Sequence, residues 1–177
     1  FEELDFSAKE AEQMVAVLID WIDENHDPEE NGAEDSYYQQ LDPPYNSKDG
    51  PLDSFEELSL VKGFSPEVLK KLAPHVTVYA QGGETLNINT ASREVLSSWG
   101  GWYNLEDIDT LLTAREERPF TKMKDLTDLI GEAKVPGGIV LVSSTFRIES
   151  WGGVNDGARS MEAIVNKSGS ILYLKVN

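Results

Sequence analysis

The sequence predicts an α+β protein in which a helical block, residues 1–135, precedes a set of antiparallel strands, residues 136–177. Two observations favour this order. Apolar residues recur at helical spacing as far as Ile130, and from Ile139 onward the runs are rich in Val, Ile, Thr and Phe and are separated by Gly-containing turns. With 177 residues, 40% of them hydrophobic, the chain can bury the core of one large domain or two small ones.

The first helix is expected over residues 7–22. Ser7, followed three residues later by Glu10, forms a capping box that favours a helix start at this point. Six apolar residues share one face at helical spacing and are predicted to be core: Ala11, Met14, Val15, Leu18, Ile19 and Ile22. Residues 36–53 are rich in Pro and Gly and are predicted to form an irregular loop, held to the body by Tyr37, Tyr38 and Tyr45.

Shorter helices are predicted over residues 54–74 and 86–131. Gly63 separates two helices of the first segment, and Gly131 closes the last helix of the second. Ser54 is followed by Glu57 at the spacing of a second capping box. The expected N-caps are Ser54, Ser65, Thr90 and Asn104.

Three strands are predicted in the C-terminal part, over residues 139–150, 159–165 and 171–176. The turns between them are expected at Gly152-Gly153, Asn155-Asp156-Gly157 and Lys167-Ser168-Gly169. Because three strands covered on one face are only marginally stable alone, we expect them to join further strands or a helix from outside the helical block.

Residues 20–38 form a strongly acidic stretch. No Lys or Arg occurs between Lys9 and Lys48, so carboxylates held close in a folded loop would repel one another unless a cation lay among them. Oxygen-bearing side chains recur with the spacing of an EF-hand loop at Asp23, Asn25, Asp27, Glu29, Asn31 and Glu34. Pro28 occupies the position where an EF-hand requires Gly, so another oxygen-rich loop is expected. These ligands favour a hard cation such as Ca²⁺, and a solvated acidic loop is the alternative.

Charge and composition exclude several classes of function. The formal net charge of −17 opposes binding to nucleic-acid phosphates and to anionic membranes. The chain has no Cys, hence no disulfide or thiolate metal site, and no apolar run long enough to span a bilayer. Two histidines, without a nucleophile elbow or a phosphate-binding loop, argue against an enzyme, and no catalytic residue is assigned. Because the first residue is Phe, the chain is expected to be a fragment that lacks an upstream segment.

Two segments resemble the helix-hairpin-helix repeats of competence DNA-uptake proteins. They are Leu-Asn-Ile-Asn-Thr-Ala-Ser-Arg-Glu-Val-Leu, residues 86–96, and Arg-Glu-Glu-Arg-Pro-Phe, residues 115–120. This resemblance implies helix-hairpin-helix-like (SAM-like) repeats in the helical block. It also provides the alternative function, a DNA-binding module whose Gly-rich loops present backbone N–H groups to phosphates. The negative charge opposes that alternative, and the segment Trp99-Gly100-Gly101-Trp102 departs from the loop pattern.

A longer resemblance runs from about residue 10 to the C-terminus. It rests on Leu-Ile-Asp-Trp-Ile-Asp at 18–23, Gly-Ala-Glu-Asp at 32–35, Pro-Pro-Tyr at 43–45 and Leu-Asn-Ile-Asn-Thr-Ala at 86–91, in this order. In this arrangement the chain resembles the type II secretion minor pseudopilin K subunit family. The resemblance implies a helical domain inserted in a pilin-like α/β domain, of which this chain carries mainly the C-terminal antiparallel strands.

The same resemblance implies a structural role at the tip of the type II secretion pseudopilus, with the minor pseudopilins I and J as partners. It places the chain in the periplasmic domain of a bacterial protein anchored in the inner membrane. It also implies calcium in the acidic loop, with these residues carried over as ligands: Asp23, Asp27, Glu34 and Asp35. Asn87 and Asn89 are weighed as further ligands, although turn and cap hydrogen bonds are their more expected role. Asp20 is expected to support the site, and His26 to be an exposed, poor calcium ligand.

Overall fold

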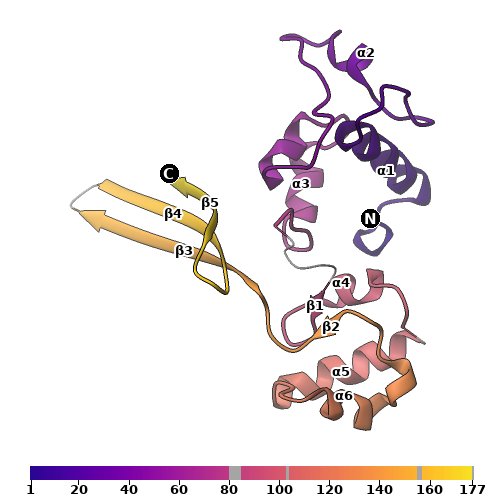
Figure 1. The fold of residues 1–177 in the computed structure, drawn as a ribbon, viewed down its shortest axis with the longest axis vertical. Helices are drawn as coiled ribbons and strands as arrows, with labels where there is room; N and C mark the ends of the chain where they lie inside the picture. Colours follow the sequence, from indigo (N-terminus) through magenta and orange to yellow (C-terminus); the bar gives the residue numbers. More distant parts are fainter. Residues whose placement is uncertain (80–84, 103, 155–156, 177) are drawn as a thin grey trace. The chain divides into compact units, whose positions relative to one another are not determined.

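The computed structural model describes residues 1–79, 85–102, 104–154 and 157–176. The chain forms two compact units, Phe1–Val78 and Tyr79–Asn177, whose elements are labelled in Figure 1. Each unit has its own cluster of buried apolar residues. Helices occur in both units and an antiparallel sheet ends the second, so the predicted α+β class is confirmed. The predicted division into a helical domain, 1–135, and C-terminal strands, 136–177, stays a prediction.

The first unit is built around helix α1, Ala8–Ile22. Its predicted capping box is confirmed, because Ser7 Oγ accepts from the Glu10 N–H at 3.3 Å while Glu10 accepts from the Ser7 N–H at 2.9 Å. The other elements of this unit are the 3-10 helices η1, Glu2–Leu4, and η2, Phe55–Leu60, and the helices α2, Asp35–Tyr38, and α3, Pro66–Leu72.

The buried face of α1 differs from the predicted apolar stripe. Met14, Val17 and Trp21 are buried at 8%, 3% and 3% exposure. Three residues that the prediction placed in the core are instead 38–45% exposed: Val15, Ile19 and Ile22. Trp21 explains the rotation, because an indole ring buries more apolar area than a β-branched side chain and therefore determines which face turns inward.

Aromatic side chains hold the Pro-rich loop on α1, as the sequence predicted. The Trp21 ring meets Tyr38 edge-on at 5.1 Å between centroids, and Tyr38 stacks on Tyr45 at 5.3 Å. Tyr38 is fully buried, and this burial raises the pKa of its hydroxyl to about 12. Tyr45 donates from its hydroxyl to the Leu60 carbonyl at 2.8 Å, which ties the loop to η2.

Glu57 has a different role from the predicted one. The segment after Ser54 is a 3-10 helix without a side-chain cap, so the second capping box was wrong. The Glu57 carboxylate instead accepts from Trp21 Nε1 at 3.0 Å, Lys48 Nζ at 2.8 Å and the Asp53 N–H at 2.9 Å. Burial alone would raise the pKa of Glu57, but these three donors hold that pKa below its ordinary value.

The helical part of the second unit contains α4, Arg93–Ser98, α5, Leu105–Glu117, α6, Met123–Ile130, and the 3-10 helix η3, Glu132–Lys134. Asn104 caps α5 by accepting from the Asp107 N–H at 2.9 Å, which confirms that prediction. The predicted cap at Thr90 was wrong, because Ser92 caps α4. Thr90 belongs to a turn that the Asn87 carbonyl closes, so the helix begins two residues later than expected.

A short parallel pair joins the two ends of this helical block. Strand β1, Leu86–Asn87, pairs with β2, Ile139–Val140. Beside it, the Asn89 amide donates to the Phe120 and Leu141 carbonyls, both at 2.9 Å. The fully buried core consists of Ile88, Leu96, Ile108, Leu111 and Leu126. The helix-hairpin-helix character of this block stays a prediction.

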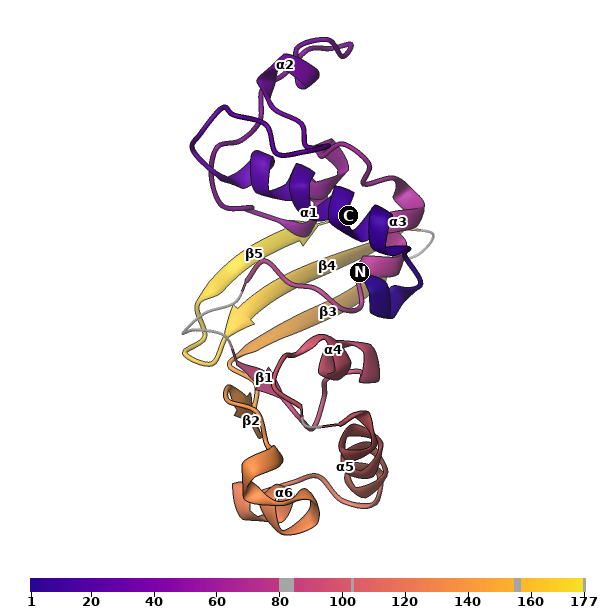
Figure 2. The same cartoon turned by 90° about the vertical axis from the view of Figure 1, so that its right-hand side faces the viewer.

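The second unit ends in a three-stranded antiparallel sheet in the order β3-β4-β5 (Figure 2). The strands are β3, Thr145–Val154, β4, Gly157–Asn166, and β5, Ile171–Val176. The single strand predicted over 139–150 was wrong, because β2 and β3 are separate. A turn at Gly152-Gly153 was also wrong, since both residues pair with β4. The predicted turn at 155–157 includes residues outside the described ones.

The two faces of this sheet differ in polarity. Cross-strand partners share a face, and the register gathers six apolar side chains with 41–62% exposure on one face: Phe146, Ile148, Met161, Ile171, Leu174 and Val176. The other face carries the Arg147–Glu162 ion pair at 3.1 Å. Tyr173 and the exposed Trp151 lie on this second face as well, and the Tyr173 ring meets the Tyr79 ring at 5.8 Å. The sequence predicts that a further strand or helix covers this sheet, and the apolar face is the surface that such an element would cover.

Candidate metal centre

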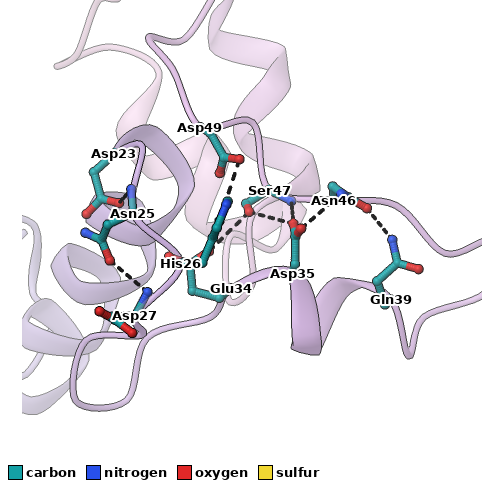
Figure 3. A network of polar contacts seen from close by, with 10 residues as sticks. All are labelled: Asp23, Asn25, His26, Asp27, Glu34, Asp35, Gln39, Asn46, Ser47 and Asp49. Atoms are coloured by element: carbon teal, nitrogen blue, oxygen red, sulfur yellow. Dashed lines mark hydrogen bonds and ion pairs between the residues drawn. The ribbon is translucent and has the colours of Figure 1, made fainter.

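The loop between α1 and α2 begins with two side-chain turns (Figure 3). The Asn25 N–H donates to Asp23 Oδ1 at 3.1 Å, and the Asp27 N–H donates to Asn25 Oδ1 at 2.8 Å. Asn and Asp favour such turns because their short side chains accept from the backbone two residues on. The alternating oxygen side chains that suggested an EF-hand therefore shape this part of the loop.

Two consecutive acids, Glu34 and Asp35, end the loop. Asp35 accepts from the Ser47 N–H at 2.9 Å, from Ser47 Oγ at 2.8 Å and from Asn46 Nδ2 at 2.9 Å. Glu34 is only 3% exposed, and its Oε2 lies 3.2 Å from the same Ser47 hydroxyl. One hydroxyl proton cannot serve both carboxylates. Glu34 Oε1 is buried and has no hydrogen-bond partner in the described part of the chain.

Asp49 approaches from the far end of the Pro-rich loop. Its backbone is in the left-handed region, with φ 52°, and its N–H donates to the Trp21 carbonyl at 3.1 Å. Asp49 Oδ1 is buried without a hydrogen-bond partner among the described residues, and Oδ2 lies 3.9 Å from His26 Nδ1. Ligand atoms of His26, Glu34 and Asp49 all lie within 4.8 Å of one another (Figure 3).

This group of His26, Glu34 and Asp49 contains two carboxylates and no Lys or Arg. Burial raises the pKa of Glu34, and the negative charges of Asp20, Asp23 and Asp49 raise it further. A buried carboxylate oxygen without a donor costs free energy, and Glu34 and Asp49, which have ligand atoms close together, each carry one such oxygen. A hard divalent cation between Glu34 Oε1 and Asp49 Oδ1 would satisfy both. The His26 side chain is 67% exposed, as predicted, and lies at the solvent side of the group.

The structure treats the four predicted ligands differently. It places Glu34 in the compact group, and it puts Asp23 close enough for its charge to act on Glu34. Asp35 is engaged in hydrogen bonds, and Asp27 is exposed in the loop. The four-residue ligand set stays a prediction. Asp49 was missed because ligand spacing was counted only within the acidic stretch. The turn signal Asp49-Gly50-Pro51 marked the place where the loop returns.

Asn87 and Asn89 have the structural role that the sequence favoured. Asn87 Nδ2 donates to Ser143 Oγ at 2.8 Å, and the Asn89 side chain bridges backbone groups of the second unit, accepting from the Phe120 N–H at 2.8 Å.

No helix within the described residues has the length and apolarity needed to cross a bilayer.

Comparison with models of known protein families shows which family the chain belongs to. A model of the first domain of type II secretion system protein K matches residues 1–81, and a second model of the same protein matches residues 86–142. The chain belongs to the type II secretion system protein K family. Among its relatives, protein K of Aeromonas hydrophila is 31% identical over 132 residues, 72% of this chain and 40% of the relative. Protein K of Klebsiella pneumoniae is 36% identical over 78 residues, 44% of this chain and 24% of the relative. The matched stretch of this family member therefore covers less than half the length of either relative.

A solved structure shares the fold of this family member over nearly its whole length. The crystal structure of the GspK-GspI-GspJ complex from enterotoxigenic Escherichia coli contains a chain that matches with a TM-score of 0.68 and 21% identity. The match covers 99% of the present chain and 66% of that chain. The shared fold thus extends past residue 142, where the family models end, into the antiparallel strands.

Proposed function

We propose that this chain is part of a minor pseudopilin that acts at the tip of the type II secretion pseudopilus, with the pseudopilins I and J as partners. The observation that carries the proposal is the family match over residues 1–81 and 86–142. The fold shared with a chain of a GspK-GspI-GspJ complex supports the choice of partners. The role is structural and serves protein export, without catalysis by the chain.

Calcium is the second part of the proposal, and the buried carboxylates of the first unit support it. Glu34 Oε1 and Asp49 Oδ1 are buried acceptors without donors in the described chain. Ca²⁺ is a hard cation that prefers carboxylate and carbonyl oxygens, and it accepts irregular geometry. Binding it would stabilise the loop on α1, because the cation offsets the burial and the repulsion that raise the pKa of Glu34.

The sheet β3-β4-β5 is the third part. We assign it to a pilin-like domain in which the six-residue apolar face packs against segments supplied by the longer protein. An open face of this kind is costly in water. The relatives are more than twice as long as the stretch matched here, so they contain chain that can supply the cover. In this arrangement the helical block is an insertion, and the protein is anchored in the inner membrane with this part in the periplasm.

Co-purification tests the assembly. A tagged full-length protein carrying this chain is expressed with pseudopilins I and J of the same organism, with calcium or with a chelator. We expect both partners to co-purify in calcium. Glu34→Gln combined with Asp49→Asn should weaken recovery, whereas Glu24→Gln with Glu30→Gln, which makes the same charge change in the exposed loop, should not.

Recovery of the K-family protein without I or J under both conditions would contradict the assembly role. Calcium binding without these partners would then favour an acidic calcium-binding adhesion module. A gel shift of duplex DNA at physiological salt would instead favour the helix-hairpin-helix alternative.

A further inference from the structure

We propose that Asp20 is the positioning residue of the Glu34–Asp49 cation site, and that it fixes the loop without binding the cation. The inference rests on the proposed calcium binding and adds the group that holds the ligands in place. Asp20 lies near the end of α1 and has no exposed surface. Its Oδ1 accepts from the Glu29 N–H at 2.9 Å, and its Oδ2 accepts from the Ala33 N–H at 2.6 Å. One side chain therefore closes residues 29–33 onto the helix.

Gly32 shows how closely the loop lies against this carboxylate. A Cβ at position 32 would stand 2.7 Å from Asp20 Cγ and would overlap Oδ2. On its other side, the Gly32 carbonyl accepts from Lys62 Nζ at 3.0 Å. The same ammonium lies 4.8 Å from the centroid of the Tyr37 ring. Asp20 and Lys62 thus hold residue 32 from two directions, two positions before Glu34.

Asp20 supports the ligands rather than joining them. Its oxygens point at backbone N–H groups, and the residues whose ligand atoms lie within 4.8 Å of one another are His26, Glu34 and Asp49. A carboxylate that accepts two backbone N–H groups is fixed in direction. A site whose ligands are held before binding loses less entropy when the cation arrives. The buried Asp20 therefore raises cation affinity through the position of Glu34.

The experiment compares calcium affinity, by titration calorimetry, with hydrogen exchange of the amides at residues 29 and 33. In Asp20→Asn one amide group must present N–H to a backbone N–H. We expect exchange at both positions to accelerate and calcium Kd to rise about 10- to 100-fold, the range for supporting residues of metal sites. Gly32→Ala should do the same without a change of charge. Glu34→Gln should lose affinity while exchange at residue 33 stays slow.

Two matched controls test whether a change in calcium Kd comes from the position of Glu34, from the loss of a negative charge in the loop, or from adding a Cβ to a glycine. Glu30→Gln removes one exposed charge from the same loop, and Gly50→Ala adds a Cβ that meets only the Lys48 carbonyl at 3.9 Å. Both should keep the wild-type Kd. If Asp20→Asn does not fold, Lys62→Met, which removes the ammonium contacts to the Gly32 carbonyl and to the Tyr37 ring, should raise Kd in the same direction.

Accelerated exchange with an unchanged Kd would make Asp20 a purely structural residue and would overturn the proposal. Wild-type protein that binds no calcium would instead refute the calcium part of the proposed function. In that case hydrogen exchange measured in chelator still tests whether Asp20 holds the loop. Unchanged protection of the amides at residues 29 and 33 in Asp20→Asn would overturn that role as well.

Discussion

Replacing Glu57 by Gln tests how the Pro-rich loop is held on the first unit. Trp21 donates to Glu57 Oε1, whereas Lys48 and the Asp53 N–H donate to Oε2. A Gln side chain has one carbonyl oxygen, so in either orientation at least one donor meets an N–H group. A hydrogen bond to a charged group contributes about 1.5–3 kcal/mol. Lys48 is 24% exposed, so solvent screens part of its interaction and we expect a loss of about 2 kcal/mol at neutral pH.

The pH dependence of this loss has a defined sign. The pKa of Glu57 in the folded protein lies below its ordinary value of 4.5, so folding favours the ionised carboxylate. The stabilisation is complete above that ordinary value and disappears as the pH falls through the lower, folded-state pKa. The difference between wild type and Glu57→Gln should therefore shrink in acid.

Urea denaturation measures the stability of the first unit alone when unfolding is monitored by hydrogen exchange of peptides from α1. The control is Glu12→Gln, an exposed residue of the same helix that should change stability little. A loss in Glu57→Gln no larger than in this control at neutral pH would refute the role assigned to the three donors.

Three further changes have defined outcomes. Leu111→Ala should cost the second unit about 2–5 kcal/mol, measured by urea denaturation, because Leu111 is fully buried; no loss would contradict the core. Arg115→Met should cost about 1–3 kcal/mol in the same assay, since the carbonyls of Ile88 and Ala91 lose their guanidinium donor; wild-type stability would speak against that bridge. Because burial raises the pKa of Glu34, folding without calcium should become more favourable as the pH falls through that raised pKa toward the ordinary value of 4.5, and Glu34→Gln should lack this gain in melting temperature. An equal gain in Glu34→Gln would assign it to another group.

Local signals predicted the helices of this protein well. Ser7 and Glu10 cap α1 with atoms three residues apart, and Asn104 caps α5 in the same way, so the sequence alone contains both partners. Glu57 stands at the same spacing from Ser54, yet its carboxylate serves Lys48 and Trp21. Competition from distant donors is invisible in a short window of sequence.

Long-range pairing explains the errors in the strands. Gly152 and Gly153 resemble a turn, but ladder partners on β4 keep both in β3. The register of an antiparallel pair depends on both strands, and no window that contains one strand includes this information. The prediction of the buried face of α1 was wrong for a related reason. Trp21 determines which face turns inward only when Tyr38 and Tyr45 are in place against it.

The predicted ligand set and the compact group of the structure share one residue, Glu34. The excess of acids predicted a cation in the acidic loop, which stays a prediction, and Glu34 is the buried acid of that loop. Asp49 reaches the same place because its N–H bonds to the Trp21 carbonyl, a contact made by the fold. Asp20 was expected to support the site from the helix, and its two backbone hydrogen bonds give that expectation a geometry.

Anomalous diffraction from a crystal grown in millimolar calcium tests the buried cation most directly. We predict one anomalous peak about 2.3–2.6 Å from both Glu34 Oε1 and Asp49 Oδ1, the distance of calcium from its oxygen ligands. Well-ordered density at that position with water-like distances and no anomalous signal would contradict it.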